Sequence, residues 1–342
     1  MSTPETGRHA VGSFDLLSPG DAVRAVERAY AVVLEGTLDS YPSYVNRVYG
    51  MRREDGEALV AKFYRPGRWT RAAILDEHRF LQDLAAAEIP VIAPLPGVDG
   101  GTLQELEVDG EDAIGRARFL FAAFPRAGGR TFEPESGDDL LRFGSLVGRC
   151  HAVGVAGSAP DRVVCEPSGL TSSFVDELLE EELVHPDCRD EFERIARRTI
   201  GEIAPLFEGV PRSRIHGDCH RGNLIDRPGR GLTLIDFDDM MSGPAVQDVW
   251  LVLPGYAADC PRELDLVLQG FERFSAFDRG TLRLIEPLRF MRMIYFLVWR
   301  ARQRGDFWFR GSFPDWGSEA FWIKETEDLR VQAEVIEKAL ED

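Results

Sequence analysis

Several features that would assign this chain to a membrane, to the cell exterior or to a nucleic acid are missing. The N-terminus MSTPETGRHA lacks the apolar stretch of a secretory signal. The most apolar run, Phe290 to Trp299, is interrupted by Arg292 and is too short to cross a bilayer. The five cysteines form no C-x-x-C pair, and the formal net charge of −18 disfavours nucleic acid and anionic membranes as partners. We therefore expect a cytoplasmic protein with reduced thiols.

Lysine is also scarce. Only Lys62, Lys324 and Lys338 occur among the 40 basic residues, so arginine supplies nearly all the positive charge. Lys62 interrupts the apolar run from Leu59 to Tyr64. One interpretation is a surface lysine whose aliphatic stem covers apolar area. Because the chain otherwise uses arginine, we favour a lysine that is required for its chemistry.

The stretch from Arg214 to Leu253 holds the densest set of candidate functional residues. It contains His216-Gly217-Asp218, and Asn223 and Asp236 follow. A glycine-rich turn between two short apolar runs predicts a β-hairpin that brings Asn223 and Asp236 side by side. Asp218 is expected at the mouth of the loop that precedes the hairpin.

These are the residue types that phosphoryl transfer from a nucleotide requires. One carboxylate accepts or orients the attacking hydroxyl, while an amide oxygen and a second carboxylate hold Mg²⁺ against the phosphates. We predict Asp218 and Asp236 as catalytic residues, with Asn223 and Asp236 as the metal ligands. The alternative is a surface hairpin with solvated acids. Asp248 is expected to brace the catalytic loop through hydrogen bonds, and His216 to be structural.

At 342 residues the chain exceeds what a single hydrophobic core usually serves, which predicts two lobes. The first, residues 1–124, reads as five antiparallel strands with a helix from Thr70 to Glu88 between the third and fourth. A hinge is expected at 125–129. The second lobe, 130–342, is expected to be mostly helical, which gives an α+β, bilobal, protein-kinase-like fold. The helices predicted beyond the hinge are 137–153, 172–184, 187–207, 245–253, 262–274, 281–304 and 318–340.

The first lobe should supply the nucleotide-binding half of the site. Lys62 on a strand, held by Glu77 on the following helix, matches the lysine and glutamate that position nucleotide phosphates in kinases. No G-x-G-x-x-G occurs in the first hundred residues. The turn at 40–43 lies where a phosphate-covering loop belongs, and Ser43 offers a hydroxyl there.

Four runs of residues resemble the bacterial stress response kinase A family. They are S-Y-x-N-R-V-Y from Ser43, K-F-Y-R-P-x-R-W from Lys62, H-G-D-C-H-R-G-N from His216 and D-x-D-D from Asp236. The resemblance extends from about residue 38 to 330. This family belongs to the wider group of aminoglycoside phosphotransferase and choline kinase-like proteins. The chain departs from the family pattern in a longer first turn and a slightly longer hairpin.

The resemblance implies an ATP- and Mg²⁺-dependent serine/threonine protein kinase, monomeric and cytoplasmic, that acts in envelope or oxidative stress responses. By motif position, Asp218 would accept the proton, Asn223 and Asp236 would bind the metal, and Ser43 would contact ATP. The implied partners are ATP and a protein substrate.

Two other functions fit the same residues. A small-molecule kinase would use the same machinery on an antibiotic or metabolite, and a pseudokinase would bind nucleotide as a scaffold. The complete set of candidate residues argues against the scaffold. Arginines in the segment 289–304 alternate with aromatic residues, and we expect them on an outer face that repels cationic aminoglycosides. The acidic run 177–182 would attract such compounds, so electrostatics alone does not decide the acceptor.

Overall fold

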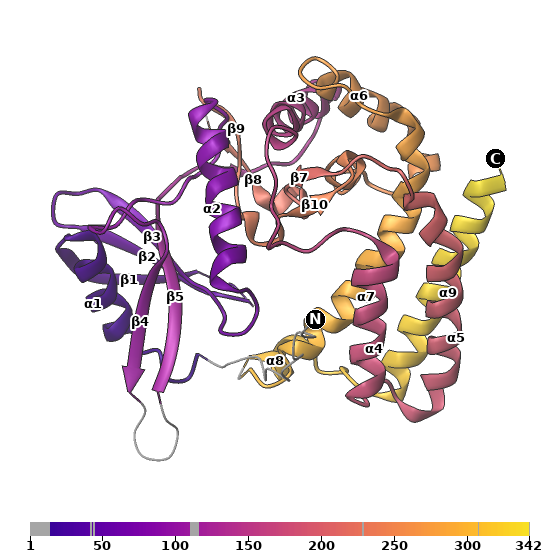
Figure 1. Cartoon of the computed structure of the whole chain (residues 1–342), viewed down its shortest axis with the longest axis horizontal. Coiled ribbons are helices and arrows are strands. Elements are labelled where there is room, and N and C mark those ends of the chain that lie inside the picture. The colour runs from indigo at the N-terminus through magenta and orange to yellow at the C-terminus, as the bar shows by residue number, and fades with distance from the viewer. Residues whose placement is uncertain are drawn as a thin grey trace, which may run out of the picture. The chain divides into compact units, whose positions relative to one another are not determined.

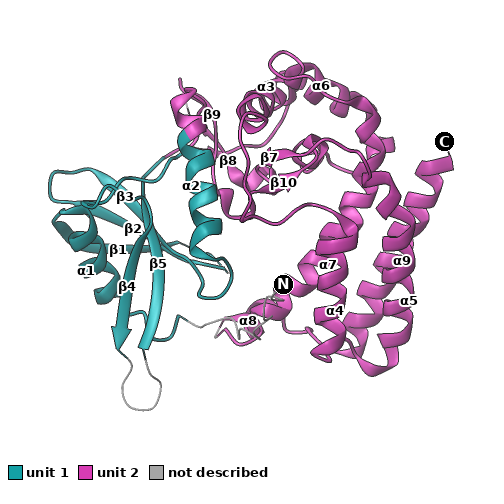
Figure 2. Cartoon of the chain, in the orientation of Figure 1, with its two compact units in different colours: residues 1–82, 92–127 teal, residues 83–91, 128–342 magenta. Residues whose placement is uncertain are grey.

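The computed structural model describes residues 14–41, 43, 45–109, 116–227, 229–306 and 308–341. The chain divides into two compact units (Figure 2). Unit 1 comprises residues 1–82 and 92–127, and unit 2 comprises residues 83–91 and 128–342. The lobe boundaries expected at 124–129 stay a prediction, and this division differs from them in grouping 83–91 with unit 2. Each unit is described by itself.

Unit 1 is built on a five-stranded antiparallel sheet (Figure 1). The strand order is β1-β2-β3-β5-β4. Strand β5 therefore lies next to β3, and β4 forms the edge of the sheet. Helix α2 (Arg71–Ala86) connects β3 to the β4–β5 hairpin, which confirms the predicted helix between the third and fourth strands. The strands are β1 (Leu34–Tyr41), β2 (Arg47–Arg53), β3 (Ala58–Phe63), β4 (Gln104–Asp109) and β5 (Arg116–Pro125).

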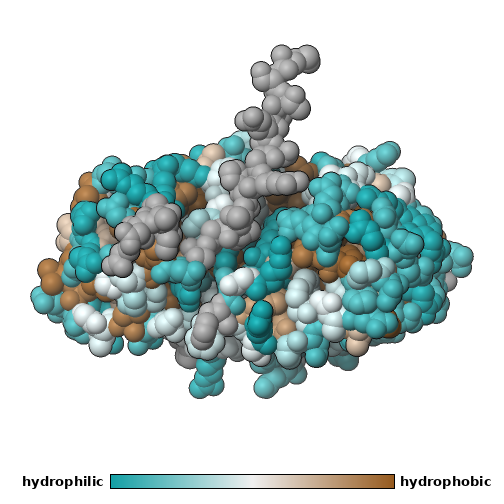
Figure 3. All heavy atoms as spheres, turned by 90° about the horizontal axis from the view of Figure 1, so that it is seen from below, coloured by the Kyte–Doolittle hydropathy of each residue, from teal (hydrophilic) through white to brown (hydrophobic). Residues whose placement is uncertain are grey.

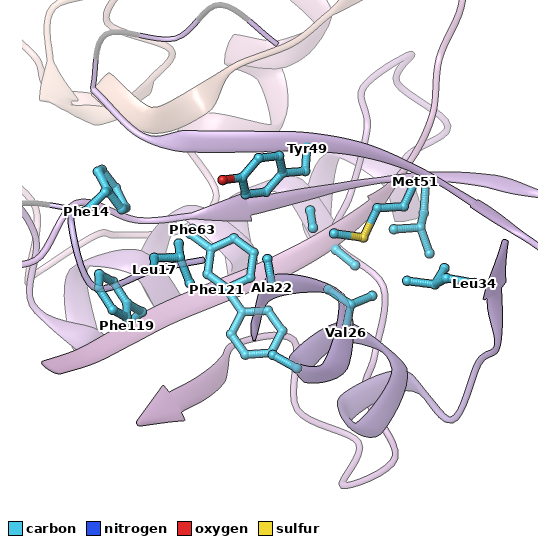
Figure 4. Close-up of a cluster of buried hydrophobic side chains, with 14 residues drawn as sticks. Phe14, Leu17, Ala22, Val26, Leu34, Tyr49, Met51, Phe63, Phe119 and Phe121 are labelled. Carbon is cyan, nitrogen blue, oxygen red and sulfur yellow. The ribbon is translucent and has the colours of Figure 1, made fainter. Parts of the chain in front are cut away.

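One face of this sheet carries the main core of unit 1, against helix α1 (Pro19–Tyr30) (Figure 4). Ser18 caps α1 by accepting a hydrogen bond from the Asp21 amide at 3.1 Å. Phe63 on β3 stacks on Phe121 of β5, with ring centroids 4.9 Å apart. A second, smaller cluster of buried side chains comprises Tyr64, Ile74, Leu103 and Ala122.

Unit 2 is mostly helical, with short strands around the predicted catalytic region (Figure 1). Helices α3 and α6 approach closely because α3 carries Gly144 and Gly148. A Cβ at Gly144 would lie 1.9 Å from the Val267 carbonyl oxygen, and one at Gly148 would lie 2.4 Å from that of Phe271. The helices are α3 (Gly137–Gly154), α4 (Ser172–Glu180), α5 (Pro186–Ile203), α6 (Pro261–Phe271), α7 (Ile285–Arg302), α8 (Phe309–Ser312) and α9 (Glu319–Glu341). The strands are β6 (Arg130–Thr131), β7 (Ser213–Ile215), β8 (Leu224–Arg227), β9 (Gly231–Leu234) and β10 (Met241–Gly243).

Most of the predicted helices form, with ends that differ from the prediction by up to four residues, but one prediction was wrong. The segment 245–253 contains only a 3₁₀ turn, Ala245–Asp248. The sequence also missed β10, which pairs with β7. The α+β kinase-like architecture itself is confirmed: a five-stranded antiparallel sheet precedes a mostly helical region. Pro42, in the turn predicted at 40–43, lies outside the described residues.

The surface drawn in Figure 3 is largely hydrophilic, with apolar residues in small separate patches. Among the residues that the structure describes, no helix is long and apolar enough to cross a membrane.

Candidate active site

The loop after β7 brings Asp218 to its position through a glycine that no other residue can replace without strain. Gly217 has φ +85°, a left-handed conformation that side chains disfavour. A Cβ at this position would also lie 2.2 Å from the Asp239 carbonyl oxygen. The backbone therefore turns sharply between His216 and Asp218.

The buried Asp248 side chain holds the backbone of this loop through hydrogen bonds. It is 2% exposed, and its two carboxylate oxygens accept hydrogen bonds from the amides of His216 and Gly217, each at 2.8 Å. The imidazole of His151 lies 2.9 Å from the same carboxylate. Burial alone would raise the pKa of Asp248, but these partners outweigh it and hold that pKa below its ordinary value. The bracing role expected for Asp248 is thus visible as three contacts.

The β8–β9 hairpin forms as the sequence predicts, and it brings Asn223 next to Ile235, the residue before Asp236. The Ile235 amide donates to the Asn223 carbonyl at 2.9 Å, and Leu224 pairs with Leu234. Asn223 is 9% exposed, and its side-chain amide nitrogen donates to the Asp218 carbonyl oxygen at 2.9 Å. Its amide oxygen therefore stays the atom with which it can bind a cation.

Asp236 has a left-handed backbone conformation, with φ 58° and ψ 70°. A non-glycine residue in this region costs roughly 1–2 kcal/mol, and such residues cluster at functional sites. Phe237, the next residue, fixes the turn by packing its ring on His216, with centroids 4.5 Å apart. His216 in turn lies 2.9 Å from the Ile235 carbonyl oxygen through Nε2, which is the structural role predicted for it.

Asp218 itself sits between two cationic or polar side chains that the sequence did not associate with it. Nη1 of Arg292 lies 2.6 Å from Oδ1, and Nε2 of His220 lies 3.3 Å from Oδ2. Burial alone would raise the pKa of Asp218, but the hydrogen bond from His220 and the charge of Arg292 hold it well below its usual range. The carboxylate is therefore ionised at neutral pH.

The contact between Arg292 and Asp218 is an ion pair without hydrogen-bond geometry, since Oδ1 accepts no hydrogen bond from the described residues. Buried acceptors without a partner are rare and call for an explanation. A hydroxyl group that enters the site can donate to Oδ1 only beside or in place of the Arg292 guanidinium, which also lies over the ring of Phe296, 4.7 Å from its centroid.

The prediction that Arg292 lies on an outer face was wrong. Its side chain is only 18% exposed, whereas Arg302 and Arg304 do lie at the surface and pair with the acidic run through Glu177 and Glu181. The sequence did contain a sign that Arg292 is buried, because this residue interrupts the most apolar run of the chain. Lys62 was singled out for the same reason: it is a charged residue within an apolar run.

In unit 1 the two predicted phosphate-positioning residues are both buried. Lys62 on β3 is 8% exposed and Glu77 on α2 is 1% exposed. The ammonium of Lys62 lies over the Tyr64 ring, 5.2 Å from its centroid. The Tyr64 hydroxyl is 2.9 Å from Nε2 of His78. The interpretation of Lys62 as a solvent-exposed lysine is therefore wrong.

Ser43 lies in the connection between β1 and β2. Its hydroxyl accepts a hydrogen bond from the Asn46 amide at 3.2 Å, and the Asn46 side chain accepts one from the Arg65 amide at 3.1 Å. Ser43 is exposed. The turn thus has an internal hydrogen bond that holds its hydroxyl at the surface of unit 1.

The predicted site residues therefore occur in two groups, one in each unit. Asp218, Asn223 and Asp236 gather around the β8–β9 hairpin in unit 2, and Lys62, Glu77 and Ser43 belong to unit 1. All five cysteines are buried and free, and burial raises the pKa of the Cys219 thiol. That thiol is therefore a packing group and not a reactive neighbour of Asp218.

Comparison with known proteins gives consistent matches over most of the chain. Residues 42–285 match the phosphotransferase enzyme family. Stress response kinase A of Escherichia coli (strain K12) is 33% identical over 331 residues, which cover 95% of each chain. Serine/threonine protein kinase RdoA of Salmonella typhimurium (strain LT2) is 32% identical over 321 residues, which cover 89% of each chain.

Solved structures show the same fold at low sequence identity. Amicoumacin kinase hAmiN, in complex with AMP-PNP, Ca²⁺ and Ami, superposes with a TM-score of 0.72 at 16% identity and 94% coverage of each chain. A microcompartment-associated aminopropanol kinase gives a TM-score of 0.68 at 18% identity, over 95% of this chain and 98% of that one. At such identities the likeness shows the fold alone.

Proposed function

Because the chain belongs to the stress response kinase A family, within the larger phosphotransferase enzyme family, we propose that it is a serine/threonine protein kinase. In this proposal it transfers the γ-phosphate of ATP to protein hydroxyls, its own included, as a cytoplasmic monomer in a stress response. The single observation that carries the proposal is the buried, ionised Asp218 whose Oδ1 accepts no hydrogen bond from the described residues.

Asp218 would orient the acceptor hydroxyl and receive its proton as the oxygen attacks the γ-phosphorus. A carboxylate with a low pKa is a weak base, so its main contribution is position: it aligns the oxygen for in-line attack. The proton leaves the hydroxyl late, once the bond to phosphorus has formed. Asp248 supports this step indirectly, because it fixes the amides of His216 and Gly217.

Asn223 and Asp236 fit a magnesium site by their chemistry. The amide nitrogen of Asn223 is engaged by the Asp218 carbonyl, which leaves a neutral oxygen, and Asp236 adds a carboxylate from a conformation that its neighbours hold. Oxygen donors with few protein carboxylates are what Mg²⁺ prefers when phosphates complete its shell. Bound there, Mg²⁺ would neutralise charge on the nucleotide phosphates.

We assign the nucleotide side to unit 1. Lys62 would contact the α- and β-phosphates, with Glu77 as its partner, and Ser43 would offer its hydroxyl to a phosphate. Burial supports the first assignment, since a buried lysine or glutamate occurs almost only when it is paired. The exposed Ser43 hydroxyl, in a turn closed by the Asn46 amide, supports the second.

The acceptor distinguishes this proposal from a small-molecule kinase. Several solved relatives by fold carry names of such kinases, for example a spectinomycin phosphotransferase in complex with ADP and spectinomycin. Aminoglycosides and choline are cations, and the acceptor hydroxyl must come within hydrogen-bond distance of Asp218. Arg292 lies beside that carboxylate and would repel a cation there. The names of the relatives at 32–33% identity also support a protein acceptor.

A direct test supplies purified protein with Mg²⁺-ATP and offers three kinds of acceptor in separate reactions. These are a generic protein acceptor, a panel of aminoglycosides, and choline with homoserine. We expect phosphoserine or phosphothreonine in the protein samples, located by peptide mass spectrometry, and ATP consumption at background with the small molecules. Strong turnover of a small molecule without protein phosphorylation would assign the chain to the small-molecule kinases.

A further inference from the structure

Unit 2 carries a groove that the catalytic assignments do not use. It has a volume of about 560 Å³ and is lined by α3, by the first residues of β9 and by the chain just beyond the end of α6. In Figure 1 these elements lie together in the part of unit 2 labelled α3, α6 and β9. The volume is within the range of pockets that hold ligands or side chains of a partner.

The groove concentrates positive charge in a chain whose net charge is −18. Four arginines and a single aspartate, Asp138, line it. Two of the arginines are engaged: Arg142 pairs with Asp139 and Asp226, each at 3.1 Å, and Arg149 donates to the Glu88 carbonyl at 2.8 Å.

The other two arginines, Arg230 and Arg273, are exposed. No carboxylate of the described residues lies within 4.0 Å of either guanidinium. This contrasts with Arg279, on the segment that follows α6, which pairs with both Asp265 and Glu272. Arg262 and Arg310 are also exposed and have no carboxylate of the described residues within 4.0 Å, but they do not line this groove. Two such arginines that line one groove together favour a site for an external anion.

Apolar side chains alternate with these charges. Leu141 and Leu146 from α3, Leu232 from β9 and Phe274 line the same groove, and Phe274 is 50% exposed. A large exposed aromatic ring beside arginines is the composition found at the centre of protein interfaces. A ligand that satisfies the groove must therefore offer both negative charge and apolar side chains.

We propose that this groove docks an acidic peptide segment of the protein acceptor, with leucine-like side chains against Phe274 and carboxylates at Arg230 and Arg273. This inference rests on the proposed function for its occupant, a protein acceptor. Charge complementarity carries it: acidic side chains pair with the two exposed guanidinium groups, and apolar side chains cover the ring. A nucleic acid fits less well, because its backbone needs an extended basic surface and this chain is strongly acidic overall.

The groove lies close enough to the catalytic residues for a docked segment to assist the reaction. It lies at the turn end of the β8–β9 hairpin, whose other end carries Asn223 and Asp236. β9 covers Gly231–Leu234, and a fully extended chain from Gly231 to Asp236 would span about 17 Å, at about 3.3 Å per residue. A docked segment would hold the rest of the acceptor near the site and raise its effective concentration there. At least about five residues must separate the acidic segment from the hydroxyl that is phosphorylated.

Binding can be measured without any catalytic activity. The probe is a short fluorescent peptide of alternating aspartate and leucine, and the readout is its anisotropy on titration with the full chain. The test variant is Arg230→Glu/Arg273→Glu. The matched control is Arg262→Glu/Arg310→Glu, which changes the net charge equally at two exposed arginines outside the groove.

We expect the groove variant to bind the probe about 10-fold more weakly than the wild type, and the control variant to bind within about twofold of it. Added salt should weaken binding to the wild type and to the control. With a protein acceptor that carries such a segment, only KM should rise in the groove variant. Without the segment, kcat and KM should equal those of the wild type.

Three results would overturn the docking site. Equal loss of binding in the two double variants would show a general charge effect, and equal binding of a lysine–leucine peptide would remove the role of the arginines. Complete competition by millimolar inorganic phosphate would indicate a site for small anions. If the peptide binds as expected but no protein is phosphorylated, the groove stands and the proposed function fails.

Discussion

The Asp248→Asn substitution tests how the fold holds the catalytic loop. One carboxylate oxygen of Asp248 serves both His151 and the His216 amide, and the other serves the Gly217 amide. An asparagine offers one acceptor oxygen, so its NH₂ group must face at least one of these donors. The variant thus loses the charge of the acceptor and leaves a buried N–H group without a partner.

The expected size of the effect follows from this geometry. Removing one partner from a buried, charged hydrogen-bonded group costs about 3–5 kcal/mol of the free energy of unfolding. For a domain of about 150–250 residues, each kcal/mol lowers Tm by about 2–4 °C, so we expect a fall of about 6–20 °C. At temperatures where the variant is folded, kcat should also fall, by about 100-fold, because displacing Asp218 by about 1 Å misaligns the hydroxyl.

Thermal unfolding followed by circular dichroism measures the first effect, and phosphate incorporation at low temperature measures the second. Asp259→Asn is the control, because Asp259 is exposed and its carboxylate makes none of these contacts. Its free energy of unfolding should change by less than about 0.5 kcal/mol. A Tm for Asp248→Asn that equals that of the control would refute the bracing role.

Three further predictions concern the site itself. Asp236→Ala should abolish Mg²⁺-dependent nucleotide binding, because the metal loses its carboxylate; a Mg²⁺ titration of ATP binding equal to that of the wild type would contradict the ligand assignment. Lys62→Met should weaken ATP binding more than AMP binding, and equal losses would show that Lys62 does not contact the outer phosphates. Arg292→Gln should raise the pKa of Asp218 toward its ordinary value, because the cation that lowers it is gone. The Asp218 carboxylate of the wild type stays ionised to lower pH than that of the variant. The fall of kcat/KM on the acid side of its pH profile should therefore begin at a higher pH in the variant. An unchanged acid side would show that Arg292 does not act on this base.

Local patterns were enough to predict much of the fold. The helix between the third and fourth strands and the glycine-rich turn between β8 and β9 follow from short-range signals, and the structure confirms both. The segment 245–253 was mispredicted because tertiary contacts override local propensity there. Gln247 donates to the Gly217 carbonyl at 2.8 Å, and Asp248 binds the same loop, so the backbone follows these contacts instead of continuing a helix.

The residues of the candidate site also fall into two classes: those that local sequence patterns predict and those that depend on tertiary contacts. Asp218, Asn223 and Asp236 lie within one short stretch, so their spacing carried the prediction. Arg292 reaches Asp218 from α7, far along the chain, and no local pattern specifies that contact. Only its isolation in an apolar run marked it. The groove with Arg230 and Arg273 is likewise assembled from segments remote in sequence.

The central claim is that Asp218 directs a phosphoryl group to protein hydroxyls. The measurement that tests it most directly is intact-mass spectrometry of the wild type and of Asp218→Asn, each incubated with Mg²⁺-ATP. The account predicts mass increments of one phosphoryl group in the wild type. In the variant it predicts about 10²–10⁴-fold slower phosphorylation, with unchanged ATP affinity. Equal phosphorylation of the two proteins would contradict the role of Asp218, and a wild type that stays unmodified and modifies no other protein would contradict the protein kinase.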